Sequence, residues 1–586
     1  MPTSLVAGNS LLAIDVGAAN TRAVLFDVIE GEYRFVASGS APSTAEAPVK
    51  DVSEGARNAI ENLQSILKKN LLNSARDLIL PSQNDGSGVD GLVVTLSAGP
   101  SIKTVVVGLL KDVSLESARR LTESTYARIL DTLNLSDHRK PDKQIDNLLR
   151  ARPELIVIAG GTDGGASRSI QKLLEPVGLA SYLMPAEKRP AVLFAGNEKL
   201  AGEIKTLVGS LASSLHFSPN IRPSLETEDL EPAERELAHM TVSIRKKLIK
   251  GVELLDLWAG GHTLPTAYAT GRMVRFLSSV YGSQRGAILS VDLGASSAVF
   301  AAGFKNKSVL KVYPQFGVGE HLTGLLNYCT VDDILRWSSL DIPPSSILDY
   351  LHQKALYPAT IPATKEDLVV AQSVAKQALY LAMQAARRDF PKDAIGLKSN
   401  LTPLFDPIIA GGGYLSDASR PGMGLLLLLD AVQPVGISTI ILDQNNLLPL
   451  LGVAASQNNI LPVQVLESGA FLSAATVVSP VVSAKYGASI LRAKLTYESG
   501  VEAQIDLKYG SLETLPLAIG ETGKLAIQVS KGADIGFGPG RGKEIQVSGG
   551  ALGIVFDGRG RPLDLPTDPV RRRELIKKWN WTLGGG

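Results

Sequence analysis

The chain contains a single cysteine, Cys329, among its 586 residues. One thiol can build neither an internal disulfide framework nor a metal site of several thiolates. We interpret Cys329 as a small buried hydrophobic residue, with a nucleophilic role as the alternative. The six histidines are scattered along the chain without the spacing of metal ligands. These absences exclude a disulfide scaffold and a thiolate-bound metal centre.

Aromatic residues are also scarce, at 5% of the chain, and 59 basic against 58 acidic residues leave a net charge of +1. No global field therefore favours nucleic acid or an anionic membrane. The most apolar stretches, GMGLLLLLDAV and SGAFLSAATVVSPVVSA, are too short or too interrupted by Ser and Pro to span a bilayer. The start, MPTSLVAGNS, lacks the pattern of a secretory signal. We expect a soluble, cytoplasmic protein without nucleic-acid or membrane partners.

The length predicts more than one domain, because a single core does not grow to this size. Up to about residue 480, continuous apolar runs alternate with helical patterns, which is typical of strands buried on both faces in α/β layers. After that, short alternating runs separated by glycines indicate an all-β module. We therefore predict a first lobe over 1–100, an inserted or continuing α/β region over 101–285, a second lobe over 286–483, and a β-rich module ending in a basic helix over 484–586.

Two stretches rich in charge lie outside the motifs. The mixed-charge stretch 226–250 predicts one long helix or two, and we interpret its charges as a solvated face. The basic helix near the end of the chain carries Trp579 and Trp581. We interpret it as a surface helix held by tryptophan packing, with contact to an acidic partner or RNA as the alternative.

An apolar run that ends in Asp-x-Gly and then resumes occurs twice, in LLAIDVGAANTRAVLFDV and AILSVDLGASSAVFAAGF. Each copy predicts two strands joined by a tight turn. The aspartate could hold Mg²⁺ through its water shell, and the small residues would let backbone N–H groups approach phosphate oxygens. An ordinary turn is the alternative for either copy alone, but two copies together favour a phosphate cradle. The candidate residues are Asp15, Gly17, Asn20 and Thr21 in the first turn, and Asp292, Gly294, Ser296 and Ser297 in the second.

Two further glycine clusters follow predicted strands. Gly411, Gly412 and Gly413 would let a backbone pass closely over a flat ligand such as adenosine. A second cluster, made of Gly160, Gly161, Asp163 and Gly164, joins a strand to a helix and is a candidate anion site. Asp163 could equally cap that helix, and the cluster matches neither a P-loop nor a dinucleotide fingerprint.

Taken with the segments IVIAGGTDGG, VLFAGNEKLAGEI, GGHTLPTAYATGRMVRFL, IIAGGGYL and LLPLLGVAA, the two turns make the chain resemble the actin/Hsp70/sugar-kinase ATPase superfamily. It looks most like the MutL family encoded beside glutamate mutase, which is unrelated to mismatch-repair MutL. The resemblance covers roughly residues 10–480 and leaves out the β-rich tail.

The resemblance implies an α/β, actin-like fold of duplicated ribonuclease-H-like lobes that binds ATP and Mg²⁺. It also implies a chaperone-like accessory protein that reactivates an adenosylcobalamin-dependent mutase by helping to expel damaged cobalamin. The two turns would then hold the phosphates, Asp15 and Asp292 would hold the magnesium shell, and Gly411 to Gly413 would approach adenosine.

The second turn departs from the family pattern, Gly-Gly-Ala-Thr-Thr-Asp. Here Gly294 is followed by Ala295, Ser296, Ser297 and Ala298, so one glycine position carries an extra methyl group and the final acidic residue is missing, and Arg22 stands where lysine is common. ATP binding tolerates such changes better than hydrolysis does, because hydrolysis needs a positioned acceptor for the attacking water. Slow or absent ATPase activity, a small-molecule kinase and a non-enzymatic scaffold with a degenerate site all stay open. The sequence fixes neither the partner nor the oligomeric state.

Overall fold

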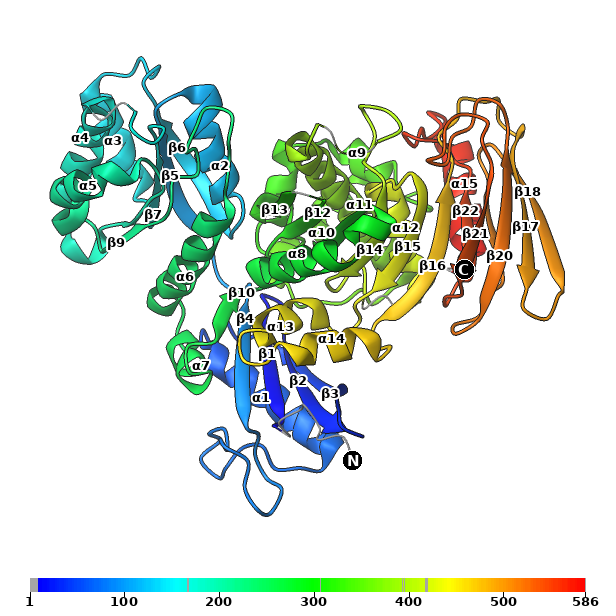
Figure 1. Ribbon diagram of the computed structural model, residues 1–586, viewed down its shortest axis with the longest axis horizontal. Coiled ribbons are helices and arrows are strands. Elements are labelled where there is room, and N and C mark those ends of the chain that lie inside the picture. The colour runs from blue at the N-terminus through cyan, green and yellow to red at the C-terminus, as the bar shows by residue number, and fades with distance from the viewer. Residues whose placement is uncertain are drawn as a thin grey trace.

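The computed structural model describes residues 9–165, 168–305, 307–392, 394, 396–416 and 420–584. Four sheets organise this part of the chain, each with helices or another sheet packed against it (Figure 1). The helices are α1 (Val52–Leu67), α2 (Glu116–Thr122), α3 (Pro141–Ala151), α4 (Arg168–Leu183), α5 (Ala201–Val208), α6 (Glu231–Leu248), α7 (Val252–Trp258), α8 (Thr266–Arg285), α9 (Val331–Leu335), α10 (Pro344–Leu356), α11 (Lys365–Ala386), α12 (Pro421–Ala431), α13 (Leu447–Ala454), α14 (Ile460–Glu467) and α15 (Pro569–Thr582).

The first lobe is built on a five-stranded sheet with the order β3-β2-β1-β4-β10. Strands β1 to β3 form an antiparallel meander, and β4 and β10 then continue the sheet parallel to β1. All six residues of β1 are buried, as a continuous apolar run predicts. The strands are β1 (Leu11–Val16), β2 (Asn20–Ile29), β3 (Glu32–Pro42), β4 (Gly91–Leu96) and β10 (Thr263–Pro265).

The second lobe repeats this topology at the start of an eight-stranded sheet, in the order β13-β12-β11-β14-β15-β16-β22-β19. Here β11 to β13 form the meander, and β14 and β15 run parallel to β11. The repeated order confirms the predicted actin-like fold of duplicated lobes. The strands are β11 (Ala287–Leu293), β12 (Ala298–Phe304), β13 (Lys307–Tyr313), β14 (Phe405–Gly411), β15 (Gly436–Leu442), β16 (Leu472–Ser479), β19 (Leu512–Leu515) and β22 (Ile554–Asp557).

A separate parallel sheet, in the order β6-β5-β7-β8-β9, lies between β4 and β10 in the chain and is inserted into the first lobe (Figure 1). It confirms the parallel sheet predicted for this region. Its two faces are covered by different helices, and α6 then leads the chain back to the first lobe through α7 and β10. The strands are β5 (Ile102–Gly108), β6 (Ala127–Leu133), β7 (Leu155–Ala159), β8 (Ala191–Phe194) and β9 (Ser214–Phe217).

The interpretation of 226–250 as a solvated charged face is only partly right. The helix α6 does expose several charges, but it buries Glu234 and Arg245, whose exposed fractions are 5% and 1%. Its apolar residues Leu237, Met240 and Ile244 pack on the inserted sheet. The hydrophobic period and the charge pattern of a sequence do not reveal that a helix connects two domains.

The C-terminal region forms a four-stranded antiparallel sheet, in the order β18-β17-β20-β21, that packs face to face against the far edge of the second lobe. Two further strands of the C-terminal region, β19 and β22, do not join this sheet and instead complete the sheet of the second lobe. Likewise β10, from the predicted 101–285 region, pairs within the first lobe. The antiparallel strands are β17 (Ser489–Tyr497), β18 (Glu502–Lys508), β20 (Thr522–Val529) and β21 (Lys543–Ser548).

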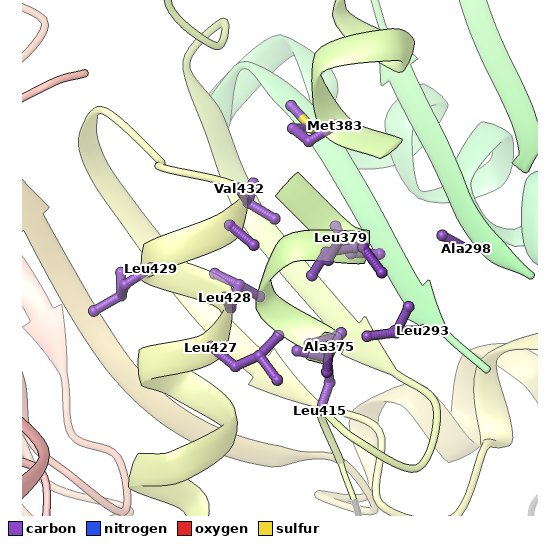
Figure 2. Packing of buried hydrophobic residues seen from close by; sticks show 14 of the residues in the cluster. Leu293, Ala298, Ala375, Leu379, Met383, Leu415, Leu427, Leu428, Leu429 and Val432 are labelled. Atoms are coloured by element: carbon purple, nitrogen blue, oxygen red, sulfur yellow. The ribbon is translucent and has the colours of Figure 1, made fainter. Parts of the chain in front are cut away.

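The lobes share one hydrophobic core, because α8 and α13 lie between their sheets. This cluster joins Leu11 and Val93 of the first lobe to Ile288 and Ile409 of the second. On the opposite face of the second sheet, α11 and α12 pack against Leu293 and neighbouring residues directly below the second turn (Figure 2). Among the described residues, no helix combines the length and apolar character that crossing a membrane requires.

A buried ion network attaches the C-terminal region to the second lobe. Arg559 donates to Asp557 at 2.8 Å and also to Asp430 of α12, which is paired with Lys376 of α11 at 2.7 Å. The two cationic neighbours of Asp557, Arg559 and Arg561, hold the pKa of that carboxyl well below its usual range against the effect of burial. These charges are fully buried, so each depends on its partners.

The two terminal tryptophans offer a matched test of this attachment. Trp579 is 4% exposed, donates to the Gly510 carbonyl at 3.2 Å and lies 4.9 Å from the Arg559 guanidinium, whereas Trp581 is 78% exposed. Replacing Trp579 with Ala should lower the free energy of unfolding by about 3–5 kcal/mol, because a large cavity remains. Trp581→Ala should stay within about 0.5 kcal/mol of wild type. Urea unfolding measures both, and equal losses would contradict the assigned packing.

Candidate functional site

The two Asp-x-Gly turns have the same backbone closure. The Gly17 N–H donates to the Asn20 carbonyl at 3.0 Å, and the Gly294 N–H donates to the Ser297 carbonyl at 3.0 Å. A Cβ on Gly17 would lie 2.6 Å from the Asn20 carbonyl oxygen, so only glycine fits there. The structure therefore brings the repeated motif to equivalent positions, at the ends of the first strands of the two lobes.

Asp15 is buried and fixed by three hydrogen bonds from different elements. Thr95 of β4 donates at 2.6 Å, Thr266 at the start of α8 donates at 3.1 Å, and the Asn446 amide donates to the other carboxylate oxygen at 2.8 Å. Burial raises the pKa of Asp15, while these donors and the nearby Arg22 act in the opposite direction. Because all three bonded donors are neutral, the carboxylate charge is oriented by these bonds without being neutralised by them.

Asp292 lies close to the same asparagine. It pairs in register with Gly411 of β14, where a Cβ would lie 3.2 Å from an Asp292 carboxylate oxygen and 3.8 Å from the Asn446 side-chain oxygen. Both aspartates also raise the pKa of the Tyr126 phenol, after burial, which is the larger cause. The two predicted Mg²⁺ residues are thus brought together around Asn446 and Tyr126.

Asn446 is held at the N-terminus of α13 by a short turn. It adopts a left-handed conformation with φ of 54°, which asparagine tolerates better than most residues. Asp443 accepts hydrogen bonds from the Leu447 and Leu448 N–H groups, each at 2.7 Å. Burial raises the pKa of Asp443 to about 6, and repulsion from Asp15 contributes in the same direction. Sequence inspection missed Asn446 and Asp443, although QNN before an apolar helix carries a helix-start signal.

The predicted adenosine-binding glycines end β14 beside the second turn. Gly412 has φ of 81°, and a Cβ there would lie 2.5 Å from the Leu293 carbonyl oxygen, so its requirement for glycine comes from packing on β11. Gly411 lies against Asp292, and Gly413 is exposed. The run thus connects the second turn to the surface.

The remaining turn residues have different environments. The Thr21 hydroxyl is fully buried near Gly55 of α1, and the structure shows no hydrogen-bond partner for it. Asn20 is exposed and contributes its carbonyl to the turn, and Ser297 does the same from a buried position. Ser296, in contrast, lines the space between the turns.

The predicted anion-binding cluster lies elsewhere, at the carboxyl end of β7 in the inserted sheet (Figure 1). The Asn220 amide donates to the Asp163 carboxylate at 2.8 Å and to the Gly161 carbonyl at 2.9 Å. Gly160 packs beside Leu109, and Gly164 has φ of 79°. The structure does not bring these residues to the Asp-x-Gly turns.

A small pocket of about 20 Å³, partly open to solvent, lies between the two turns. Ala18 of the first turn and Ala295 of the second line it, together with charged residues that sequence inspection missed. These are Glu46 from the loop after β3, Arg245 from α6, and Glu320 and His321 from the segment after β13. Partial loss of solvation and repulsion from the neighbouring Glu320 raise the pKa of Glu46, although its side chain still reaches solvent. No sequence motif joins these residues, because they come from three separate regions of the chain.

The segment before Glu320 is positioned by the second turn itself. The Val318 N–H donates to the Gly294 carbonyl at 3.1 Å, and Cβ atoms on Gly317 or Gly319 would collide with Ala295 and its neighbours. His321 then lies 3.3 Å from the Ser101 hydroxyl, between Nε2 and Oγ. The segment that packs on the second turn therefore also contacts Ser101, at the start of the inserted domain.

The residues present suit a magnesium nucleotide in their chemistry. The Asp15 and Asp292 carboxylates, which both lie near Asn446, offer the oxygen atoms that a hydrated Mg²⁺ prefers, and the small residues Ala18 and Ala295 line the space between the turns. Among the described residues, no group of three or more His, Cys, Asp or Glu gathers in metal-ligand geometry. That Asp15 and Asp292 hold Mg²⁺ through water stays a prediction.

A model of the family described as MutL protein matches residues 11–469 of the chain. A curated relative, Protein MutL from Clostridium tetanomorphum, is 24% identical over 293 residues, which cover 49% of this chain and 56% of the relative. The chain thus spans little more than half the length of that relative.

Solved structures share only a distant likeness. Nucleotide-free acetone carboxylase covers 85% of this chain and 81% of its own, at 13% identity and a TM-score of 0.28. The nucleotide-free diol dehydratase-reactivating factor covers 78% and 99%, at 9% identity and a TM-score of 0.28. The ethanolamine utilization protein EutJ from Carboxydothermus hydrogenoformans covers 77% and 91%, at 9% identity and a TM-score of 0.28.

The raised pKa of Asp443 predicts a pH dependence of stability. In the unfolded chain the group ionises near pH 4, and in the folded protein near pH 6. Its contribution to stability is therefore complete below about pH 4 and is lost as the pH rises through about 6. Relative to Asp443→Asn, wild type should lose on the order of 3 kcal/mol between pH 4 and pH 7. Urea unfolding across this range tests it, and parallel curves for the two proteins would contradict the assignment.

Proposed function

Because the chain belongs to the MutL protein family, we propose that it is an ATP-binding accessory protein of an adenosylcobalamin-dependent mutase such as glutamate mutase. The observation that supports nucleotide binding is the pair of equivalent turns, Asp15 to Asn20 and Asp292 to Ser297, which face one pocket from two lobes. The partner follows from the family resemblance.

The nucleotide-binding residues in this proposal are those predicted from the two turns and the glycine run. Backbone N–H groups of the turns and the Ser296 hydroxyl bind phosphate oxygens, and Gly411 to Gly413 pass beside the adenosine. Mg²⁺, when bound, neutralises phosphate charge, and Asp15 and Asp292 orient its water shell. Thr95, Thr266 and Asn446 fix the direction of the Asp15 carboxylate.

Hydrolysis needs a group that accepts a proton from the attacking water. The second turn has Ala298 where the family has its acidic residue, but Glu46 and Glu320 bring carboxylates to the same pocket from outside the motif. Glu46, with its raised pKa, is the better candidate to accept a proton from an attacking water. We propose slow hydrolysis with Glu46 as the base. A kinase that uses Glu46 to activate a small hydroxyl substrate is the alternative favoured by the same observation.

The nucleotide site can be tested by calorimetry. Asp15→Ala should weaken Mg-ATP binding at least tenfold, because the magnesium shell loses an anchor and three donors lose their acceptor. Asp142→Ala, an exposed aspartate in the first turn of α3, is the control and should bind as wild type. Thermal unfolding of each variant without nucleotide separates lost binding from lost structure. Wild-type affinity in a folded Asp15→Ala protein would place the site elsewhere.

Phosphate release tests the proposed base. Glu46→Gln should lower the rate of release about 10²-fold or more while leaving ATP affinity within twofold of wild type. Glu320→Gln is the paired control and should have the smaller effect on the rate. A Glu46→Gln enzyme as fast as wild type would eliminate Glu46 as the base, and no release from wild type would identify a binding-only switch.

The accessory role has a separate test. A cobalamin mutase inactivated by damaged cofactor is mixed with this protein, Mg-ATP and fresh adenosylcobalamin, and recovered mutase activity is measured. Recovery should require both ATP and this protein, and Asp15→Ala should not support it. Recovery that is equal without this protein would refute the accessory role while leaving nucleotide binding intact.

A further inference from the structure

Arg245 is a buried cation without a carboxylate partner among the described residues. Only 1% of it is exposed, it takes part in no ion pair, and its Nη2 has no hydrogen-bond acceptor within reach. Its Nη1 donates to the Pro100 carbonyl. Burial lowers the pKa of Arg245 to about 10, which still leaves it charged at neutral pH. A buried charge that is only partly satisfied is costly, so such a residue in a native protein calls for an explanation.

The position of Arg245 offers an explanation for its unsatisfied charge. It lines the pocket between the two turns, together with Ala18, Ala295 and Ser296. The carboxylates in that pocket, Glu46 and Glu320, are exposed, and neither is within ion-pair distance of Arg245. The unpaired guanidinium group thus lies where the two predicted phosphate turns meet. An arginine fork matches the geometry of phosphate oxygens.

The backbone around Arg245 makes room for this placement. Gly99 has φ of 97°, and a Cβ there would lie 2.6 Å from Arg245 Nη1 and 2.2 Å from the Ile249 side chain. Any other residue at 99 would displace the guanidinium group or the helix end. Arg245 therefore lies at the junction of the first lobe and the inserted domain, where the chain leaves the first lobe at Pro100 and returns through α6.

From these contacts we propose that Arg245 binds the terminal phosphate of the nucleotide held between the turns. Its charge complements that phosphate, and its unpaired Nη2 donates to a phosphate oxygen. Arg245 lies on α6, which packs on the inserted sheet. Binding of the terminal phosphate would therefore be coupled to the position of the inserted domain. The assignment rests on the nucleotide site proposed above, and adds a phosphate ligand from outside both motifs.

The test compares ADP with a non-hydrolysable ATP analogue by calorimetry, both with Mg²⁺. Wild type should prefer the analogue. Arg245→Met keeps the apolar stem but loses the charge, so analogue affinity should fall about tenfold or more while ADP affinity stays within twofold. Lys247→Met, the same type of change at an exposed position of α6, should retain the wild-type preference. An unchanged preference in Arg245→Met overturns the proposal.

Stability distinguishes a phosphate ligand from a structural residue. Removing a buried charge that lacks a counterion should leave the melting temperature without ligand unchanged or higher. A lower melting temperature together with an unchanged nucleotide preference would mean that Arg245 only holds the Pro100 carbonyl, which overturns the proposal. If Arg245→Met does not fold, Arg245→Gln undergoes the same comparison.

Inorganic phosphate separates this proposal from the nucleotide site as a whole. If neither nucleotide binds wild type, the proposed nucleotide function fails, and the phosphate experiment then decides on Arg245. Millimolar phosphate should raise the melting temperature of wild type and Lys247→Met but not that of Arg245→Met. No rise in wild type, or an equal rise in all three proteins, overturns the proposal. If nucleotides bind, added phosphate should reduce the difference in affinity between the ATP analogue and ADP.

Discussion

The arrangement of the molecule centres on one buried carboxylate, that of Asp15. Its hydrogen bonds come from β4, from the start of α8 and from the turn before α13, so a single side chain joins both lobes and the helices between them. The bonds orient the carboxylate but, coming from neutral groups, do not cancel its charge. A buried charge is tolerated where it is well bonded and where a cation can approach it. The structural role of Asp15 and the role proposed for it in orienting Mg²⁺ therefore fall on the same carboxylate.

The two lobes are similar in topology and unequal in chemistry. The position in register with Asp15 is Thr95, a hydrogen-bond donor, whereas the position in register with Asp292 is Gly411, which leaves space. The first lobe therefore fixes its aspartate through a side chain, and the second brings a glycine run past its own. A shared core around α8 and α13 holds these different halves against each other. The asymmetry already visible in the two turns thus extends into the strands behind them.

Much of the fold could be predicted from the sequence because it depends on local patterns. Continuous apolar runs identify buried strands such as β1, and the repeated Asp-x-Gly identifies the turns, the first of which has no room for a Cβ at Gly17. The exchange of β10, β19 and β22 between regions was not predicted, because strand pairing over long separations leaves no local trace. The interpretation of the α6 charges as solvent-facing failed for Arg245 for the same reason. A charge in a helix has the same local pattern whether its face meets water or another domain.

The sequence by itself determined the two strand-turn-strand units with their aspartates and glycines, since these depend on backbone conformation and on side-chain volume within a few residues, and the duplicated lobes came from the family resemblance. Only the tertiary structure decided which groups surround those turns. Glu46, Glu320 and Arg245 enter one pocket from different regions, and Thr95, Thr266 and Asn446 converge on Asp15 over long separations. Their convergence comes from packing, which buries apolar surface without regard to distance along the chain. Burial of apolar surface therefore positions the polar side chains of the site.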